Sequence, residues 1–99
     1  MNIKITSEAK KMIQKTLNDK DVTNPVVRIY AAGFGWGGPT FGIALDEQKE
    51  NDYVVKEDGV NYVTEKELID KYGSFVVDYS NGWLYKGFKI QPSYGGSSC

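Results

Sequence analysis

The chain contains a single cysteine, Cys99, which is its last residue and follows the Gly- and Ser-rich segment 95–98. Such a segment has almost no apolar surface to bury, and disorder concentrates at chain ends, so we expect the thiol to be accessible. Without a second cysteine, Cys99 cannot form a disulfide within the chain. The remaining interpretations are a ligand for a metal or metal cluster, a link to a second chain, attack on a substrate disulfide, or no role.

Histidine is absent from the chain. Its absence removes the usual general base near neutral pH, the Ser–His and Cys–His dyads, and the commonest nitrogen ligand for metals. Any metal chemistry must therefore use thiolate, carboxylate or ligands from outside the chain. The sequence argues against a hydrolase, and we expect a protein that is not an enzyme.

The composition is that of one globular domain. With 99 residues, 40% of them hydrophobic and 25% charged, we expect a single core that folds without disulfides or metals. The net charge of −1 provides no excess of positive charge for binding nucleic acid or an anionic membrane. No apolar run approaches a membrane span, and the first residues lack an apolar signal segment. The presence of only one cysteine and the lack of a targeting signal favour a location in the cytoplasm.

An amphipathic helix over residues 7–18 has the clearest local signature, after a short strand at residues 3–5. Thr6 or Ser7 is a suitable N-cap, and Glu8 is well placed for the helix dipole. Side chains that we expect to face the core recur at helical spacing. They are Ala9, Met12, Ile13, Thr16 and Leu17.

Most of the remaining chain has the pattern of short strands. The dipeptides Asp58-Gly59 and Asn81-Gly82 each predict a hairpin turn, because both residue pairs accept the positive φ angles of tight turns. The expected strands cover residues 26–30, 40–45, 53–55, 60–63, 75–79, 83–85 and 87–90.

A second, short helix is expected between the two hairpins. Thr64 and Glu67 have the spacing of a capping box, which predicts a helix from Thr64 to about Tyr72, ended by Gly73. One longer helix, many short strands and one short helix predict an α+β fold. We expect it to be mainly β, a compact barrel- or sandwich-like arrangement of short mixed strands with an N-terminal helix.

Acidic side chains gather between two of the expected strands. We interpret Asp46, Glu47, Glu50 and Asp52 as a solvated turn, in preference to an acid–base pair or a calcium loop.

The glycine-rich segment 33–39 is the other candidate functional region. It lacks the Gly-Lys-Ser/Thr ending of a phosphate-binding loop and leads into a strand, which argues against nucleotide binding. A tight turn at a barrel corner is the simplest interpretation. Phe34 and Trp36 would then form an exposed aromatic pair suited to an interface.

Several segments in fixed order resemble the HesB/IscA family, the A-type carriers of iron–sulphur cluster assembly. The resemblance spans the whole chain and implies the compact HesB-like fold. It rests on the segments 28–30, 35–38, 41–47, 58–60, 78–79, 87–90 and 97–99, and on the opening helix.

The resemblance also assigns cluster ligands, and the chain departs from the pattern there. Family members present one cysteine in a Gly-Cys-Ser-Gly loop and two in a C-terminal Cys-Gly-Cys, because thiolates are the usual ligands of iron–sulphur clusters. Trp36 stands at the loop cysteine's position. Cys99 matches the first cysteine of the pair, and the chain ends before the final Gly-Cys. Since some small relatives carry selenocysteine, one hypothesis places a UGA codon after Cys99.

The resemblance therefore implies a role in iron–sulphur cluster assembly or carriage, or in iron binding. Cys99 would be the metal and cofactor ligand, shared in a homodimer and completed by small thiols or by an assembly or acceptor protein. The alternative is a degenerate HesB-like module that binds a protein partner through Phe34, Gly35, Trp36, Gly37 and Gly38, without a cluster. Thiol redox chemistry through Cys99 is a third hypothesis.

For the organisation of the chain, we expect a HesB-like domain over residues 1–92. Residues 93–99 are expected to form a flexible tail, because they are rich in Gly and Ser and end in Cys99.

Overall fold

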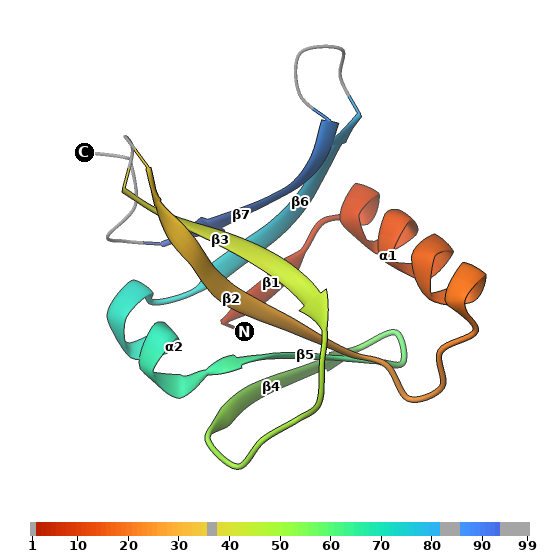
Figure 1. Cartoon of the computed structure of the whole chain (residues 1–99), viewed down its shortest axis with the longest axis horizontal. Helices are drawn as coiled ribbons and strands as arrows, with labels where there is room; N and C mark the ends of the chain where they lie inside the picture. Colours follow the sequence, from red (N-terminus) through yellow and green to blue (C-terminus); the bar gives the residue numbers. More distant parts are fainter. Residues whose placement is uncertain (1, 36–37, 82–85, 94–99) are drawn as a thin grey trace.

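The computed structural model of the chain describes residues 2–35, 38–81 and 86–93 (Figure 1). Within these ranges no helix is long and apolar enough to span a membrane. The elements, in chain order, are β1 (Ile3–Ile5), α1 (Ser7–Lys20), β2 (Val26–Gly35), β3 (Gly38–Leu45), β4 (Asp52–Glu57), β5 (Val60–Glu65), α2 (Lys66–Tyr72), β6 (Phe75–Asn81) and β7 (Lys86–Pro92).

The strands form two small mixed sheets. One has the order β3-β2-β5-β4, in which β2 and β5 are parallel and the other neighbours antiparallel. The other has the order β1-β6-β7, in which β1 is parallel to β6 and β6 antiparallel to β7. The expectation of an α+β, mainly β domain with an N-terminal helix and one further short helix is confirmed.

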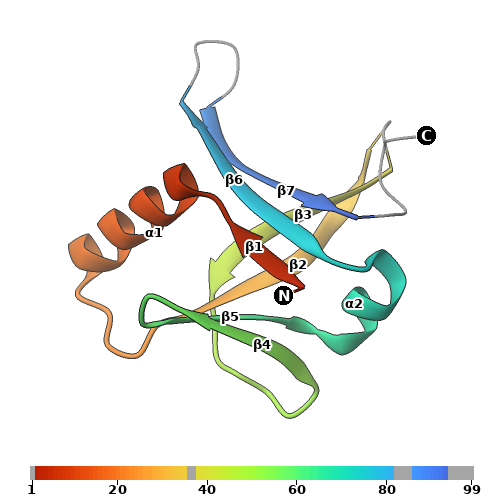
Figure 2. The ribbon, with the colours of Figure 1, turned by 180° about the vertical axis from the view of Figure 1, so that it is seen from behind.

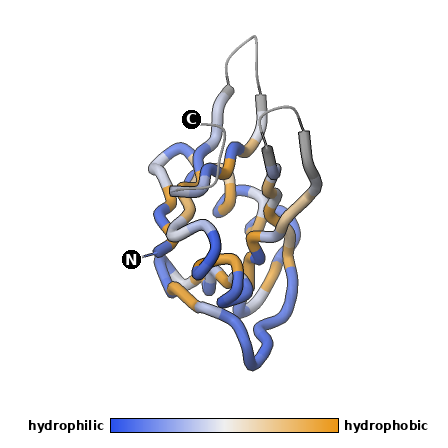
Figure 3. The backbone as a smooth tube through the Cα atoms, turned by 90° about the vertical axis from the view of Figure 1, so that its left-hand side faces the viewer, coloured by the Kyte–Doolittle hydropathy of each residue, from blue (hydrophilic) through white to orange (hydrophobic). Residues whose placement is uncertain are grey.

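The core lies between the inner faces of the two sheets, and α1 covers one side of it (Figure 2). Figure 3 shows apolar stretches of the chain in the interior and a hydrophilic β3–β4 connection at the lower end. The buried apolar cluster consists of Ile3, Ile5, Ala9, Ile13, Leu17, Val27, Ile29, Val55, Val60, Tyr62, Tyr72, Phe75, Val77 and Ile90.

Helix α1 has the N-cap that the sequence indicates. The Thr6 hydroxyl accepts a hydrogen bond from the Ala9 N–H (3.3 Å) and donates one to the Asp78 carboxylate (2.7 Å). The cap residue therefore also ties α1 to β6. The helix continues two residues past the expected end, to Lys20, where Asp21 takes a left-handed φ of 54° and donates its N–H to the last carbonyls.

The first predicted hairpin is present, whereas β6 pairs with a different strand from the one expected for the second. Asp58 and Gly59, with φ angles of 52° and 79°, join β4 to β5, as the dipeptide predicts. Strands β6 and β7 pair antiparallel as far as Asn81 and Lys86. Gly82 and the expected strand 83–85 lie outside the described residues. The partner of β6 within them is the segment expected to form a separate last strand, extended to residues 86–92.

The predicted start of the second helix is wrong. Thr64 lies in β5, is fully buried, and donates its hydroxyl hydrogen to the Ile29 carbonyl (2.9 Å), 35 residues earlier. Helix α2 begins at Lys66, and its N-cap, Glu65, makes no side-chain capping bond. A β-branched threonine suits a strand, and the distant acceptor satisfies its hydroxyl better than a helix terminus would. The predicted stop at Gly73 is confirmed by its φ of 86°.

We predict that Thr6→Ala destabilises the fold, because it removes the N-cap of α1 and the bond to Asp78 together. The free energy of unfolding should fall by about 1–2 kcal/mol, measured by urea denaturation. Thr16→Ala is the matched control, since that hydroxyl is exposed and bonds only to Met12 within the helix. The control should change stability by less than about 0.5 kcal/mol. Equal losses in the two variants would contradict the role of Thr6.

Candidate functional site

The glycine-rich segment joins β2 to β3 at the far end of their hairpin. The two strands pair out to Gly35 and Gly38, with a register shift between Ala31 and Gly33. Gly33 has a φ of 152°, a value that glycine adopts readily, and its carbonyl accepts a hydrogen bond from the Thr40 hydroxyl (3.2 Å).

Only part of the sequence-predicted site falls within the described chain. Phe34, Gly35 and Gly38 lie in the paired ends of the two strands. Trp36, Gly37 and Cys99 lie outside the described residues.

Three aromatic rings fix the start of β3 against the rest of the domain. Phe41 meets Tyr72 at 5.0 Å and Phe75 at 4.9 Å between ring centroids, both edge to face. Phe75 in turn is the register partner of Pro92 on β7. The beginning of β3 and the end of β7 are thus held on the same packed cluster.

The last described residues are anchored beside this cluster. Ser93 donates its N–H to the Ser74 carbonyl (2.8 Å), and the two serine hydroxyls hydrogen-bond to each other. In Figures 1 and 2 the far end of the β2–β3 hairpin and the end of β7 lie on the same side of the molecule as α2. The structure therefore brings together the elements that lead to Trp36 and to Cys99.

A second polar feature, which sequence reasoning missed, lies on the outer face of the four-stranded sheet. Arg28 projects there, since its neighbours in β2, Val27 and Ile29, are buried in the core. Its guanidinium donates to both oxygens of Asp52 (2.9 and 2.6 Å), to Asp46, and to the Glu47 carbonyl (3.0 Å). We call these four residues the Arg28 clasp, because they hold the β3–β4 connection against the sheet.

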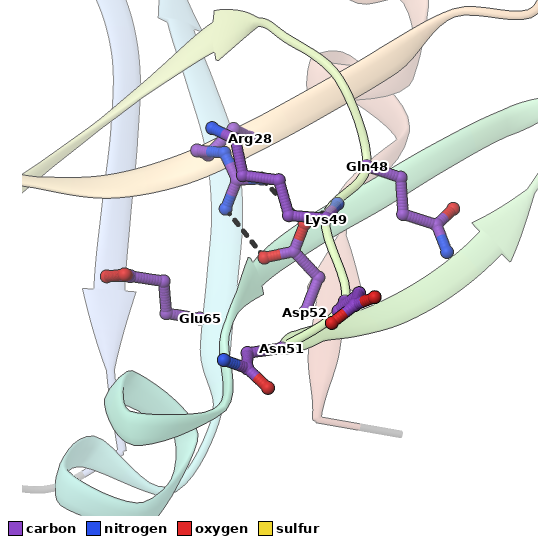
Figure 4. Close-up of a pocket in the computed structure, with 7 residues that line it drawn as sticks. Arg28, Gln48, Lys49, Asn51, Asp52 and Glu65 are labelled. Carbon is purple, nitrogen blue, oxygen red and sulfur yellow. Dashed lines mark hydrogen bonds and ion pairs between the residues drawn. The ribbon is translucent and has the colours of Figure 1, made fainter.

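The Arg28 clasp borders a polar pocket (Figure 4). Arg28 and Asp52 point at each other there, and the pocket is completed by Gln48, Lys49, Glu50, Asn51 and Glu65. Within the described chain, no group of three His, Cys, Asp or Glu side chains is arranged to hold a metal ion. The cation and the carboxylates of the clasp compensate each other, so the arrangement is suited to holding a loop in place.

Charge pairing sets the protonation states in the clasp. Hydrogen bonds with Asp52 raise the pKa of the Arg28 guanidinium above its ordinary value. The hydrogen bonds from Arg28 lower the pKa of Asp52, whose side chain is only 2% exposed. Hydrogen bonds from the backbone N–H of Glu47 and, to a smaller extent, from the Arg28 side chain lower the pKa of Asp46. The expectation of a solvated turn is therefore wrong for Asp52, which is buried and paired.

The chain is similar to curated proteins over nearly its whole length, although no family model matches it. It is 28% identical to a Bacillus subtilis protein named SufA and described as uncharacterized, over 98% of this chain and 82% of that protein. It is 24% identical to the iron–sulfur cluster insertion protein ErpA of Marinobacter nauticus, over 95% of this chain and 86% of ErpA. Its fold matches a crystal structure of IscA with the [2Fe–2S] cluster, with a TM-score of 0.74 and 17% identity, over 91% and 84% of the two chains.

The chain therefore resembles proteins named SufA and ErpA in sequence, and IscA in fold. As in the expectation drawn from the sequence, the family likeness covers the whole chain. In this chain the glycine-rich hairpin and the end of β7 meet at one aromatic cluster, whereas the Arg28 clasp lies on the outer face of the four-stranded sheet.

We predict that Arg28→Met destabilises the protein strongly, because it leaves the Asp52 carboxylate buried without a counter-charge. Breaking a buried pair in this way costs about 3–5 kcal/mol of unfolding free energy, measured by urea denaturation. Lys10→Met is the matched control, since Lys10 pairs with Glu57 (3.4 Å) on the exposed surface. The control should lose less than about 1 kcal/mol. Similar losses in both variants would show that the clasp is not a buried pair.

We also predict an acid-dependent contribution from Asp52. Its pKa is lowered in the folded state, so its stabilising effect is full above the unfolded value of about 3.9 and is lost as pH falls through the folded value. The wild type should therefore lose more stability between pH 7 and pH 3 than Asp52→Asn loses. An unchanged slope in Asp52→Asn would contradict the prediction.

Proposed function

We propose that this protein takes part in iron–sulphur cluster assembly, as a carrier that holds iron or a cluster on its way to acceptor proteins. The observation that carries the proposal is similarity along 95–100% of the chain to proteins named iron–sulfur cluster insertion protein ErpA. The fold shared with an IscA that holds a [2Fe–2S] cluster supports it. In this proposal the protein is a carrier without enzymatic activity, working in the cytoplasm.

Cys99 is the proposed ligand of this cargo. It is the only thiol in a chain that has no histidine, so no other side chain offers sulphur or imidazole nitrogen to iron. A [2Fe–2S] cluster held by thiolates takes four of them, whereas a symmetric pair of chains supplies two. Small thiols or an acceptor protein would complete the ligand set.

The course of the described chain supports a single cargo site at one end of the molecule. Phe41 follows Trp36 by five residues, and Cys99 follows Pro92 by seven; Phe41 and Pro92 both adjoin Phe75. Seven residues reach at most about 25 Å when fully extended. The length of the tether therefore keeps Cys99 within that radius of the end of β7, which adjoins the aromatic cluster that also holds the start of β3.

The tryptophan at position 36 gives the proposed carrier an open ligand set. A family cysteine stands at this position in the resemblance, so each chain has one thiolate fewer for the cargo. An acceptor that contributes its own cysteines then adds ligands without first displacing a thiolate of the loop. We propose that such acceptor proteins are the partners. The alternative of a cluster-free module that binds proteins through Phe34 and Trp36 stays a prediction.

The test is anaerobic reconstitution with ferrous iron, sulphide and excess glutathione, followed by visible absorption and iron analysis. The wild type should gain charge-transfer bands and about one iron per chain, as expected for one [2Fe–2S] cluster shared by two chains. Cys99→Ser should gain neither, because the only thiolate is gone.

Folding controls separate loss of the ligand from loss of structure. Cys99→Ser and a chain lacking residues 94–99 should both melt within about 2 °C of the wild type, because a Gly- and Ser-rich end buries little surface. Charge-transfer bands that persist undiminished in Cys99→Ser, or that are absent from the wild type, would refute the proposal.

A further inference from the structure

The edge strand β3 differs in charge from the other strands at sheet edges. An edge strand exposes unpaired backbone groups, and proteins commonly guard such edges with charged side chains. Strand β3, residues Gly38–Leu45, contains none. The other edge strands carry Lys4 in β1, Asp52, Lys56 and Glu57 in β4, and Lys86 and Lys89 in β7.

The backbone of β3 has outward-facing hydrogen-bonding groups on this edge at Ile43 and Leu45. The Asp46 N–H donates to the Val26 carbonyl (3.0 Å), and the antiparallel register pairs Leu45 with Val27. Because hydrogen-bonded and non-hydrogen-bonded pairs alternate along an antiparallel ladder, the N–H and C=O groups of Leu45 and Ile43 point away from β2. No backbone partner for these groups occurs among the described residues.

An apolar groove of about 300 Å³ runs beside this edge, between β3 and α1. Strand β3 contacts β7, but the two strands diverge toward α1, as Figures 1 and 2 show from opposite sides. Leu45 lines the groove and, at 45%, is the most exposed large apolar residue of the described chain. The other lining residues are Ile13, Thr16, Leu17, Lys20, Val27, Ile43, Ala44 and Phe88.

Lys20 is the one charged side chain in this lining. It belongs to the last turn of α1, and no ion pair with it is present among the described residues. A cation at the rim of an otherwise apolar groove complements a carboxylate that arrives with the bound molecule.

We propose that the free edge of β3 and the adjoining groove bind an extended segment of a partner protein as an added strand. The segment would pair its backbone with Ile43 and Leu45, place alternate apolar side chains in the groove, and direct one acidic side chain to Lys20. In this mode of recognition the backbone bonds give affinity and the side-chain pockets give specificity. The site uses neither Cys99 nor the glycine-rich segment, so it is tested independently of cluster binding.

The probe is an acetylated, amidated eight-residue peptide with Val, Leu, Val and Glu at its even positions and threonine at its odd positions. It is added to ¹⁵N-labelled protein while amide shifts and hydrogen exchange are followed. Bound peptide should slow exchange of the Ile43 and Leu45 amides at least tenfold, because those N–H groups gain carbonyl partners.

Two N-methylated peptides distinguish strand addition from simple apolar binding. One carries N-methyl groups at all odd positions and the other at all even positions, so each removes the donors along one side of the strand. One of the two should bind as the parent peptide does, and the other should lose affinity at least tenfold. Equal behaviour of the two peptides would overturn the proposal.

Matched surface variants test the groove itself. Leu45→Asn should weaken peptide binding at least fivefold, whereas Val76→Asn, at another exposed apolar position on the outer face of β6, should leave binding unchanged. Lys20→Met should abolish the preference for glutamate over glutamine at the eighth peptide position.

Two results would exclude a partner strand at this edge. One is the absence of any shift or slowed exchange at Ile43 and Leu45 at millimolar peptide. The other is protection of these amides without peptide that rises with protein concentration, since β3 would then pair with a second copy of the chain.

Discussion

The contact of Phe41 with Phe75 joins the two sheets, and the rest of the structure depends on it. Neither sheet is large enough to bury an inner face alone, because one has three strands and the other four. The two aromatic rings, with Tyr72 from α2, close one end of the space between the sheets. Helix α1 covers another side with Ala9, Ile13 and Leu17. The arrangement leaves β3 close to β7 at one end and apart from it at the other.

Because the space between the sheets is closed at one end only, the two ends of the molecule carry different surfaces. At the closed end, the glycine-rich hairpin and the end of β7 start from neighbouring points, which suits a site assembled from two distant segments of the chain. Toward α1, the sheets diverge and leave an apolar groove beside an unguarded strand edge. The proposed cargo site and the proposed strand-binding edge therefore use different residues.

Local signals in the sequence were sufficient wherever a structure is stabilised within a few residues. The cap of α1 at Thr6, the turn at Asp58-Gly59 and the stop at Gly73 each follow from a backbone conformation or a hydrogen bond that is local. Two of the failures involve long-range partners. Thr64 was misplaced because its hydroxyl bonds to Ile29, and Asp52 looked solvated because its counter-ion, Arg28, lies 24 residues away in a strand of β-branched residues. The candidate site at Trp36 and Cys99 rests on resemblance alone, since no local rule connects these two positions.

The parallel pairing of β1 with β6 constrains when the protein can fold. Ile3 lies opposite Phe75, so the first strand has no partner until 72 further residues have been made. Pairings between such distant residues form slowly, because a long loop has to close before they contribute. During synthesis, α1 and the β2–β3 hairpin can form early, while the N-terminal strand waits for β6 to leave the ribosome. Until β6 is available, Ile3 and Ile5 have no partner in a sheet, so β1 is expected to join the fold late.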